Sequence, residues 1–150
     1  MKKISLVAAS LSLLAAPAFA GDPEAGEQAF GQCQTCHVVA NEDGEVLAGR
    51  NARNGPNLYG IVGRQAGTVD GFRYQRSIVQ AGEEGLVWDE DSLVPYLLDP
   101  PGFLTETLGS RARSGMSHRV RSEDQARDIV AFLAQFGAPA DDAMDEDGED

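Results

Sequence analysis

Lysine is almost missing from this chain of 150 residues, and the position of the two lysines is informative. Lys2 and Lys3 precede a short apolar run over residues 4–16, which is followed by an A-x-A site that ends at Ala20. This order predicts a secretory signal peptide over residues 1–20, cleaved after Ala20. The run is too short to cross a bilayer, and no later apolar run is long enough to do so. We therefore expect a soluble protein exported to the periplasm.

Positive charge is scarce in what remains. From Gly21 onward the chain has no lysine, ten arginines and 24 carboxylates, a formal net charge of −14. Such a negative charge argues against a general nucleic-acid-binding role. Seven of the carboxylates lie in residues 141–150, and a block of like charge at a terminus is normally solvated and disordered. We expect one folded domain over residues 21–140 and an acidic, disordered tail over residues 141–150.

Cysteine is scarce too, which excludes a disulfide framework. The only two are Cys33 and Cys36, and a bridge between them would close too small a loop to stabilise a fold. His37 follows directly, so the segment reads C-x-x-C-H, the signature of covalent haem attachment. Two thiols at this spacing can add to the two vinyl groups of one haem, and the next imidazole can bind its iron. We expect one haem c, held by two thioethers, with His37 as an axial ligand.

Three other interpretations of the two cysteines compete with haem attachment. A thioredoxin-like redox pair would need a βαβ setting, which the sequence lacks. A zinc site could recruit Cys33, Cys36 and His118, but His37 is poorly placed to join its neighbour on one tetrahedral metal. A structural disulfide is the third. The complete motif in an exported chain favours haem over all three.

Methionine is the next scarce residue. Met1 lies in the signal peptide and Met144 in the acidic tail, which leaves Met116. A methionine can simply fill a gap in a core, but the Gly- and Ser-rich segment around Met116 contains few apolar residues that would belong to a core. We therefore expect Met116 to be the second axial ligand, which raises the reduction potential and opposes substrate chemistry at the iron. His118 is the rival ligand, although a solvent-facing loop position suits it better.

The alternating pattern of strands is absent, so we expect a mainly helical chain. Asp22-Pro23 should begin a helix that runs almost to Cys33. The Gly-, Asn- and Arg-rich residues 38–85 show no lasting helical period and should form ordered loops, with a short helix possible over residues 74–80.

Two helices are expected in the second half of the chain. The first of these helices has acidic residues at its start, before Leu93. It can begin as late as Ser92, because Pro95 is tolerated only in the first turn of a helix. Residues 122–125 form a capping box, and an apolar stripe follows until Gly137 ends the last helix. So few helices enclose only a small core, and a buried cofactor would resolve that shortage.

These features together resemble the class I cytochromes c of the mitochondrial type, in their periplasmic bacterial form. The similarity extends from Gly21 to about Gly137. Gly26 and Phe30 match positions of the first helix that, in the family, pack against the last helix near Phe132. The resemblance implies the all-α class I cytochrome c fold, in which a few helices and ordered loops surround one covalent haem.

The resemblance also implies a haem pocket. The Pro56 carbonyl would accept a hydrogen bond from His37 and so fix the imidazole tautomer. Buried propionates need donors, and arginine, tyrosine and tryptophan provide them, although Trp88 could equally be a core residue. Tyr96 would pack near the methionine. The pocket residues implied in this way are Pro56, Arg64, Tyr74, Trp88, Tyr96 and Ser114.

The leading functional hypothesis is a monomeric, diffusible electron carrier rather than an enzyme. Its donor would be a quinol:cytochrome c oxidoreductase, and its acceptor a terminal oxidase, a reaction centre or another reductase, in respiration or photosynthesis. A peroxidase or gas-binding protein with a labile Met116 is one alternative, and a subunit held in a larger complex is another.

Docking is the point at which the sequence departs from the family. Relatives often meet partners through lysines around the haem edge, whereas here four arginines flank the methionine, and the alternative is a solvated charged loop. The expected docking residues are Arg111, Arg113, Arg119 and Arg121.

Overall fold

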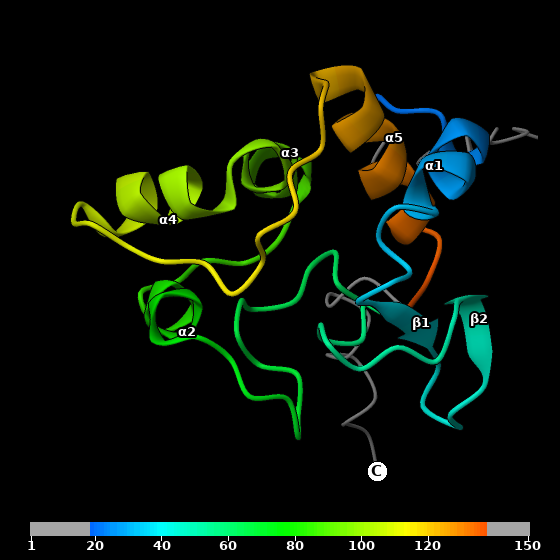
Figure 1. The fold of residues 1–150 in the computed structure, drawn as a ribbon, viewed down its shortest axis with the longest axis horizontal. Helices are drawn as coiled ribbons and strands as arrows, with labels where there is room; N and C mark the ends of the chain where they lie inside the picture. The colour runs from blue at the N-terminus through cyan, green and yellow to red at the C-terminus, as the bar shows by residue number, and fades with distance from the viewer. Residues whose placement is uncertain (1–18, 138–150) are drawn as a thin grey trace, which may run out of the picture.

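The computed structural model describes residues 19–137, so the predicted signal peptide up to residue 18 and the acidic tail lie outside the described residues. Helices dominate, as expected, and two short strands accompany them (Figure 1). In chain order the elements are α1 (Pro23–Phe30), β1 (Val38–Ala40), β2 (Val46–Gly49), α2 (Arg76–Glu83), α3 (Glu90–Leu98), α4 (Pro100–Leu108) and α5 (Glu123–Leu133). None of the described helices is long and apolar enough to span a bilayer.

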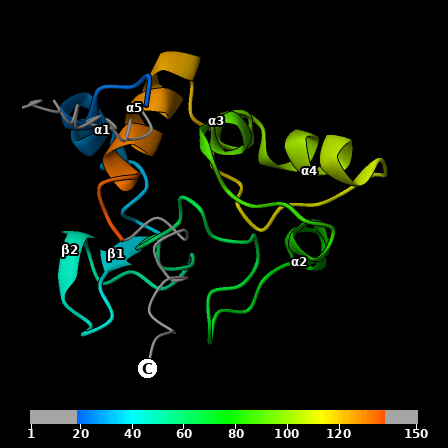
Figure 2. The same ribbon diagram turned by 180° about the vertical axis from the view of Figure 1, so that it is seen from behind.

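The first and last helices cross closely, as the sequence predicts. A Cβ at Gly26 would collide with the Asp128 carbonyl oxygen and would lie 2.7 Å from the Phe132 Cβ, so only glycine permits this approach of the two backbones. Beside it the rings of Phe30 and Phe132 lie 5.5 Å apart. Figures 1 and 2 show α1 and α5 side by side, with α3 packed against α5 and with α2 and α4 farther from α1.

Capping groups explain where α1 and α3 begin. The Asp22 side chain accepts hydrogen bonds from the amides of Glu24 and Ala25, and proline follows it at the first helical position. Asp89 and Ser92 form a reciprocal capping box, so α3 begins at Glu90 and not at Ser92. The expectation that Pro95 must lie in a first turn is therefore wrong. Pro95 stands inside the helix on an exposed side, where its missing N–H leaves a carbonyl that water can reach.

The expectation of loops throughout residues 38–85 is also wrong in part. Strands β1 and β2 pair antiparallel, with an irregularity between Val39 and Ala40. Strands of three and four residues are too short for an alternating pattern to be recognised in the sequence. The Asn57 side chain bonds the backbone of β1 at Ala40. Its amide oxygen accepts from the Ala40 N–H, and its amide nitrogen donates to the Ala40 carbonyl. Helix α2 lies over residues 76–83 instead of 74–80.

The last part of the chain differs from expectation in two places. Helix α4 was not predicted. Asp99 caps its start, Pro100 and Pro101 occupy its first positions, and Gly109 ends it at φ +61°. Helix α5 ends at Leu133, earlier than expected, and irregular turns follow it to Gly137.

Candidate haem site

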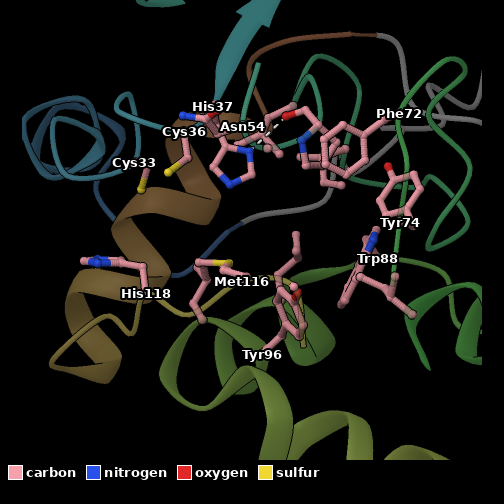
Figure 3. A pocket seen from close by; sticks show the side chains of 18 of the residues that line it. Cys33, Cys36, His37, Asn54, Phe72, Tyr74, Trp88, Tyr96, Met116 and His118 are labelled. Carbon is pink, nitrogen blue, oxygen red and sulfur yellow. Dashed lines mark hydrogen bonds between the residues drawn. The ribbon is translucent and has the colours of Figure 1, made fainter. Parts of the chain in front are cut away.

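A cavity of about 490 Å³ lies among α2, α3, α5 and the loops that carry Cys33 and Met116. Its volume falls within the range typical of cofactor pockets. Both cysteines of the C-x-x-C-H motif border it, and so do His37 and Met116 (Figure 3). Apolar side chains from distant segments form much of the remaining wall, among them Leu58, Ile61, Ile78, Leu93, Leu97, Ile129, Val130 and Leu133. The wall therefore suits a large, mainly apolar group that is anchored on one side through sulfur.

The two cysteines differ in exposure. The turns that follow α1 bring the amides of Cys36 and His37 to the Cys33 carbonyl, at 3.1 and 2.9 Å, so the motif forms one compact turn. Both thiols are free, and Cys33 is buried while Cys36 is exposed. Burial, followed by the neighbouring Cys36, raises the pKa of Cys33 to about 11. A thiol with so high a pKa is not the readily ionised thiol of a redox pair, which agrees with the rejection of a thioredoxin-like motif.

No zinc site is formed within residues 19–137. Among these residues, no group of three or more His, Cys, Asp or Glu side chains is arranged to hold a metal ion. The zinc alternative raised from the sequence therefore has no support in the described structure.

His37 is held in one orientation by the loop that faces it. Its Nδ1 lies 2.9 Å from the Pro56 carbonyl oxygen, which can only accept, so Nδ1 carries the proton and Nε2 keeps its lone pair. Burial lowers the pKa of His37, and the bond to Pro56 opposes this only in part. The ring therefore stays neutral, which is the form that metal binding requires. The hydrogen bond is the one predicted from the sequence.

Met116 faces His37 across the cavity (Figure 3). Its side chain is half-buried against the core. The Met116 amide donates to the Ser114 hydroxyl at 3.1 Å, and this hydroxyl lies 3.3 Å from the Tyr96 hydroxyl. Ser114 is not on the cavity wall, so its contacts in the described structure are with Tyr96 and Met116. The expected propionate contact of Ser114 stays a prediction.

An aromatic group closes the same side of the cavity. The rings of Trp88 and Tyr96 lie 4.9 Å apart, both residues are buried, and both line the wall. Figure 3 shows the Trp88 indole nitrogen on the cavity side, where it can donate to a bound group. Burial raises the pKa of Tyr96, and the bond to Ser114 opposes this in part.

Arg64 and Tyr74 also line the wall. The Arg64 guanidinium donates to the carbonyls of Tyr59 and Asn57, at 2.7 and 3.0 Å, and thereby ties down the loop that carries Pro56. These two bonds leave further N–H groups of the guanidinium free to donate. The Tyr74 hydroxyl accepts from the Val69 amide at 3.3 Å.

His118 is exposed, and its Nε2 lies 2.8 Å from the Gln32 Oε1. Figure 3 shows its ring directed away from the space between His37 and Met116. The structure therefore favours the solvent-facing position that the sequence suggested, with an added role in linking the methionine loop to the turn before Cys33.

The four predicted docking arginines are all exposed, but they are not equivalent. Arg119 pairs with Asp99 at 2.8 Å, which offsets its charge. Sequence reasoning missed two exposed arginines, Arg73 and Arg76, which lie close to Arg113 because the Arg113 amide bonds Ser77. Arg73 also lines the cavity. Its place between two aromatic residues in the chain, Phe72 and Tyr74, was the only available signal.

No protein-family model matches the chain. Individual proteins do. It is 58% identical over 118 residues to a cytochrome c2 of Rhodovulum adriaticum, covering 78% of this chain and 94% of that protein. It is 47% identical over 137 residues to a cytochrome c2 of Cereibacter sphaeroides, covering 89% and 94%. A solved structure of cytochrome c2 from Rhodobacter sphaeroides superposes with a TM-score of 0.76 at 49% identity, covering 77% of this chain and 96% of that one.

Proposed function

Since the chain belongs to the class I cytochromes c, with the cytochromes c2 among its relatives, we propose that it is a periplasmic electron carrier whose haem iron is bound by His37 and Met116. The family transfers electrons and is not a family of enzymes, and its c-type haem is covalently attached. The predicted fold class and cofactor are thus confirmed. One observation carries the proposal on the ligands: His37 and Met116 face each other across a cavity that both cysteines border.

Covalent haem supplies a reversible one-electron change at its iron. The chain would contribute a histidine ligand, a methionine ligand and an apolar wall. His37 stays neutral because burial opposes protonation, and its Nδ1–H bond to Pro56 fixes the tautomer that leaves the Nε2 lone pair available. Met116 would bind the iron from the side that faces His37, and a second bound side chain would oppose substrate chemistry there. The apolar wall excludes water, and exclusion of water together with a thioether ligand favours the reduced iron.

The remaining pocket residues support the proposed role of donors to the haem propionates. Arg64, Tyr74 and Trp88 lie on the wall and offer N–H or O–H groups to a buried charge, which would otherwise be costly. Among the described residues, no buried side-chain nitrogen or oxygen lacks a partner.

Partners are inferred from the family and from the charges. We place the carrier between a quinol:cytochrome c oxidoreductase and a terminal oxidase, a reaction centre or another reductase. The exposed arginines of the methionine loop support docking through that side of the molecule. The A-x-A site at Ala20 supports export and cleavage.

Two measurements test the proposal. The intact mass after acid–acetone extraction should equal the polypeptide from Gly21 plus one haem. The ferric protein should show the weak long-wavelength band of methionine-ligated haem, which Met116→Ala should abolish while lowering the potential. Met144→Ala, in the acidic tail, is the matched control and should keep the band. A bis-imidazole spectrum in the wild type would implicate His118 as the ligand instead.

A further inference from the structure

The loop that carries Met116 lacks regular secondary structure from Gly109 to Ser122. Backbone amides of such a segment must find partners outside a helix or sheet. The amide of Gly109 bonds the Glu106 carbonyl at the end of α4, at 3.2 Å. Beyond it, only the Val120 amide of this loop bonds a backbone carbonyl on another element in the described structure, that of Leu97 at 2.9 Å. The residues that lead up to Met116 are held in a different way.

Side-chain hydroxyls hold this part of the loop. The Ala112 amide donates to the Thr105 Oγ1 at 3.0 Å, and the Arg113 amide donates to the Ser77 Oγ at 3.3 Å. Thr105 belongs to α4 and Ser77 to the first turn of α2, so the two attachments come from different helices. Gly115 lies in the same place, since a Cβ there would be 3.1 Å from the Gln75 Cγ.

We propose that Ser77 and Thr105 are positioning residues for Met116. Their hydroxyls hold residues 112 and 113 between α2 and α4, so that the following residues carry the thioether into the cavity. Within residues 110–113 the hydrogen bonds of the described structure are these two alone, so opening of this segment is a local event that need not involve α1 and α5. The two hydroxyls thereby set how often Met116 leaves the iron. This inference rests on the proposed ligation by His37 and Met116.

The test uses the full-length protein with its haem, in the variants Ser77→Ala, Thr105→Val and the double variant. Imidazole at saturating concentration binds ferric iron at the rate at which Met116 departs. Each lost bond should raise this rate about two- to tenfold, and the two effects should multiply in the double variant. The long-wavelength band should remain in each single variant, weakened where Met116 is displaced more often.

Two controls are available on the same helix. Thr107→Val removes a hydroxyl of α4 that bonds the Phe103 carbonyl at 2.8 Å and does not contact the loop, so its imidazole rate should match the wild type. Thr105→Ser keeps a hydroxyl and should restore a rate near that of the wild type. Hydrogen exchange should accelerate at Ala112 and Arg113 but not in α1 or α5.

Three results would overturn the inference. The first is an imidazole rate in Ser77→Ala and Thr105→Val equal to that of Thr107→Val. The second is acceleration of exchange throughout the molecule, because the variants would then act through global stability. The third, a wild-type protein without the long-wavelength band, would refute the proposed ligation as well, so failure of the ligation and failure of the attachment are distinguishable.

Discussion

His37 owes its orientation to two adjacent residues of the facing loop. The Pro56 carbonyl accepts the Nδ1–H, and Gly55 lies directly against the ring. A Cβ at position 55 would stand 2.6 Å from Nδ1 and 2.8 Å from Nε2, closer than real side chains approach. The ring is partly buried, and moving it away from Gly55 would weaken its bond to Pro56.

Gly55→Ala should therefore displace the imidazole. We expect an altered visible spectrum and a free energy of unfolding lower by about 1–3 kcal/mol, the usual cost of overpacking. Urea unfolding and ferric absorption spectra measure the two effects. Gly44→Ala is a control, because its Cβ would meet open space at φ +81°, so it incurs backbone strain without touching the ring. An unchanged spectrum in Gly55→Ala would contradict the prediction.

Tyr96 makes the free energy of unfolding depend on pH in the alkaline range. Burial raises its pKa above the ordinary value of 10.0, although the bond to Ser114 opposes the rise. The folded protein therefore keeps the phenol proton at a pH where the unfolded chain releases it. The resulting stability is fully present below about pH 10 and is lost as the pH rises through the folded pKa.

Tyr96→Phe removes this contribution to the pH dependence. Urea unfolding of both proteins at about pH 8 and about pH 10.5 should show a steeper loss in the wild type than in the variant. Every other titrating group is common to the two proteins, so only the difference between them is interpreted. Parallel losses would show that Tyr96 ionises alike in the folded and unfolded states.

At the scale of secondary-structure elements, the crossing of α1 and α5 closes the chain. The side chains of Ile129, Phe132 and Leu133 are buried on one face of α5, and the Phe132 ring packs against Phe30. Phe132 also contacts the Phe136 ring, with centroids 5.0 Å apart. Removing the Phe132 ring would leave a cavity bordered by two rigid helices that cannot collapse into it.

Phe132→Ala should lower the free energy of unfolding by about 3–5 kcal/mol. Chemical denaturation of the haem-loaded protein measures this loss. Leu47→Ala is the matched control, since Leu47 is apolar but 41% exposed on the hairpin, and its loss should stay within about 0.5 kcal/mol. A comparably small loss in Phe132→Ala would mean that the helix crossing contributes little.

At the scale of the whole molecule, the charges are unevenly distributed. The chain is acidic, yet exposed arginines gather where α2 meets the methionine loop. Arg73 and Arg76 join Arg111 and Arg113 there, because the loop is bonded to Ser77. A basic region on an acidic protein creates a dipole that steers it toward an acidic partner.

Reversing Arg111 and Arg113 to Glu should slow association with such a partner at low salt. The effect should fade as ionic strength shortens the Debye length. Stopped-flow electron transfer across a salt series measures it. Arg50→Glu/Arg53→Glu makes the same charge change beside the hairpin and should slow association less. Equal slowing in both double variants would locate docking elsewhere or assign the effect to net charge alone.

The seven carboxylates of residues 141–150 should compete with the partner for these arginines. A tethered acidic segment acts at high effective concentration. Ending the chain at Ala140 should therefore increase the association rate at low salt, and more so in the wild type than in the Arg111→Glu/Arg113→Glu variant. Equal rates with and without the segment would rule out the competition.

Features that depend on neighbours in the chain could be predicted from the sequence alone. The C-x-x-C-H motif is complete within five residues, and Met116 stands out because it is the only methionine between Gly21 and the acidic tail. The cap at Asp22 and the capping box before α5 are likewise local, so the starts of α1 and α5 were predicted. These features can be recognised in the sequence because the interactions that produce them join residues only a few positions apart.

Other features depend on which distant segments meet, and only the tertiary structure decided them. The bond from Arg113 to Ser77 joins residues 36 positions apart, and no pattern around either one announces it. The pairing of Arg119 with Asp99 and the bonding of Asn57 to Ala40 are of the same kind. Pro95 could stand inside α3 because that side of the helix faces solvent. The sequence determines which groups can form a hydrogen bond or an ion pair, but the packing of the whole chain determines which distant group becomes the partner. Bringing distant segments together costs conformational entropy, and only many simultaneous contacts offset that cost.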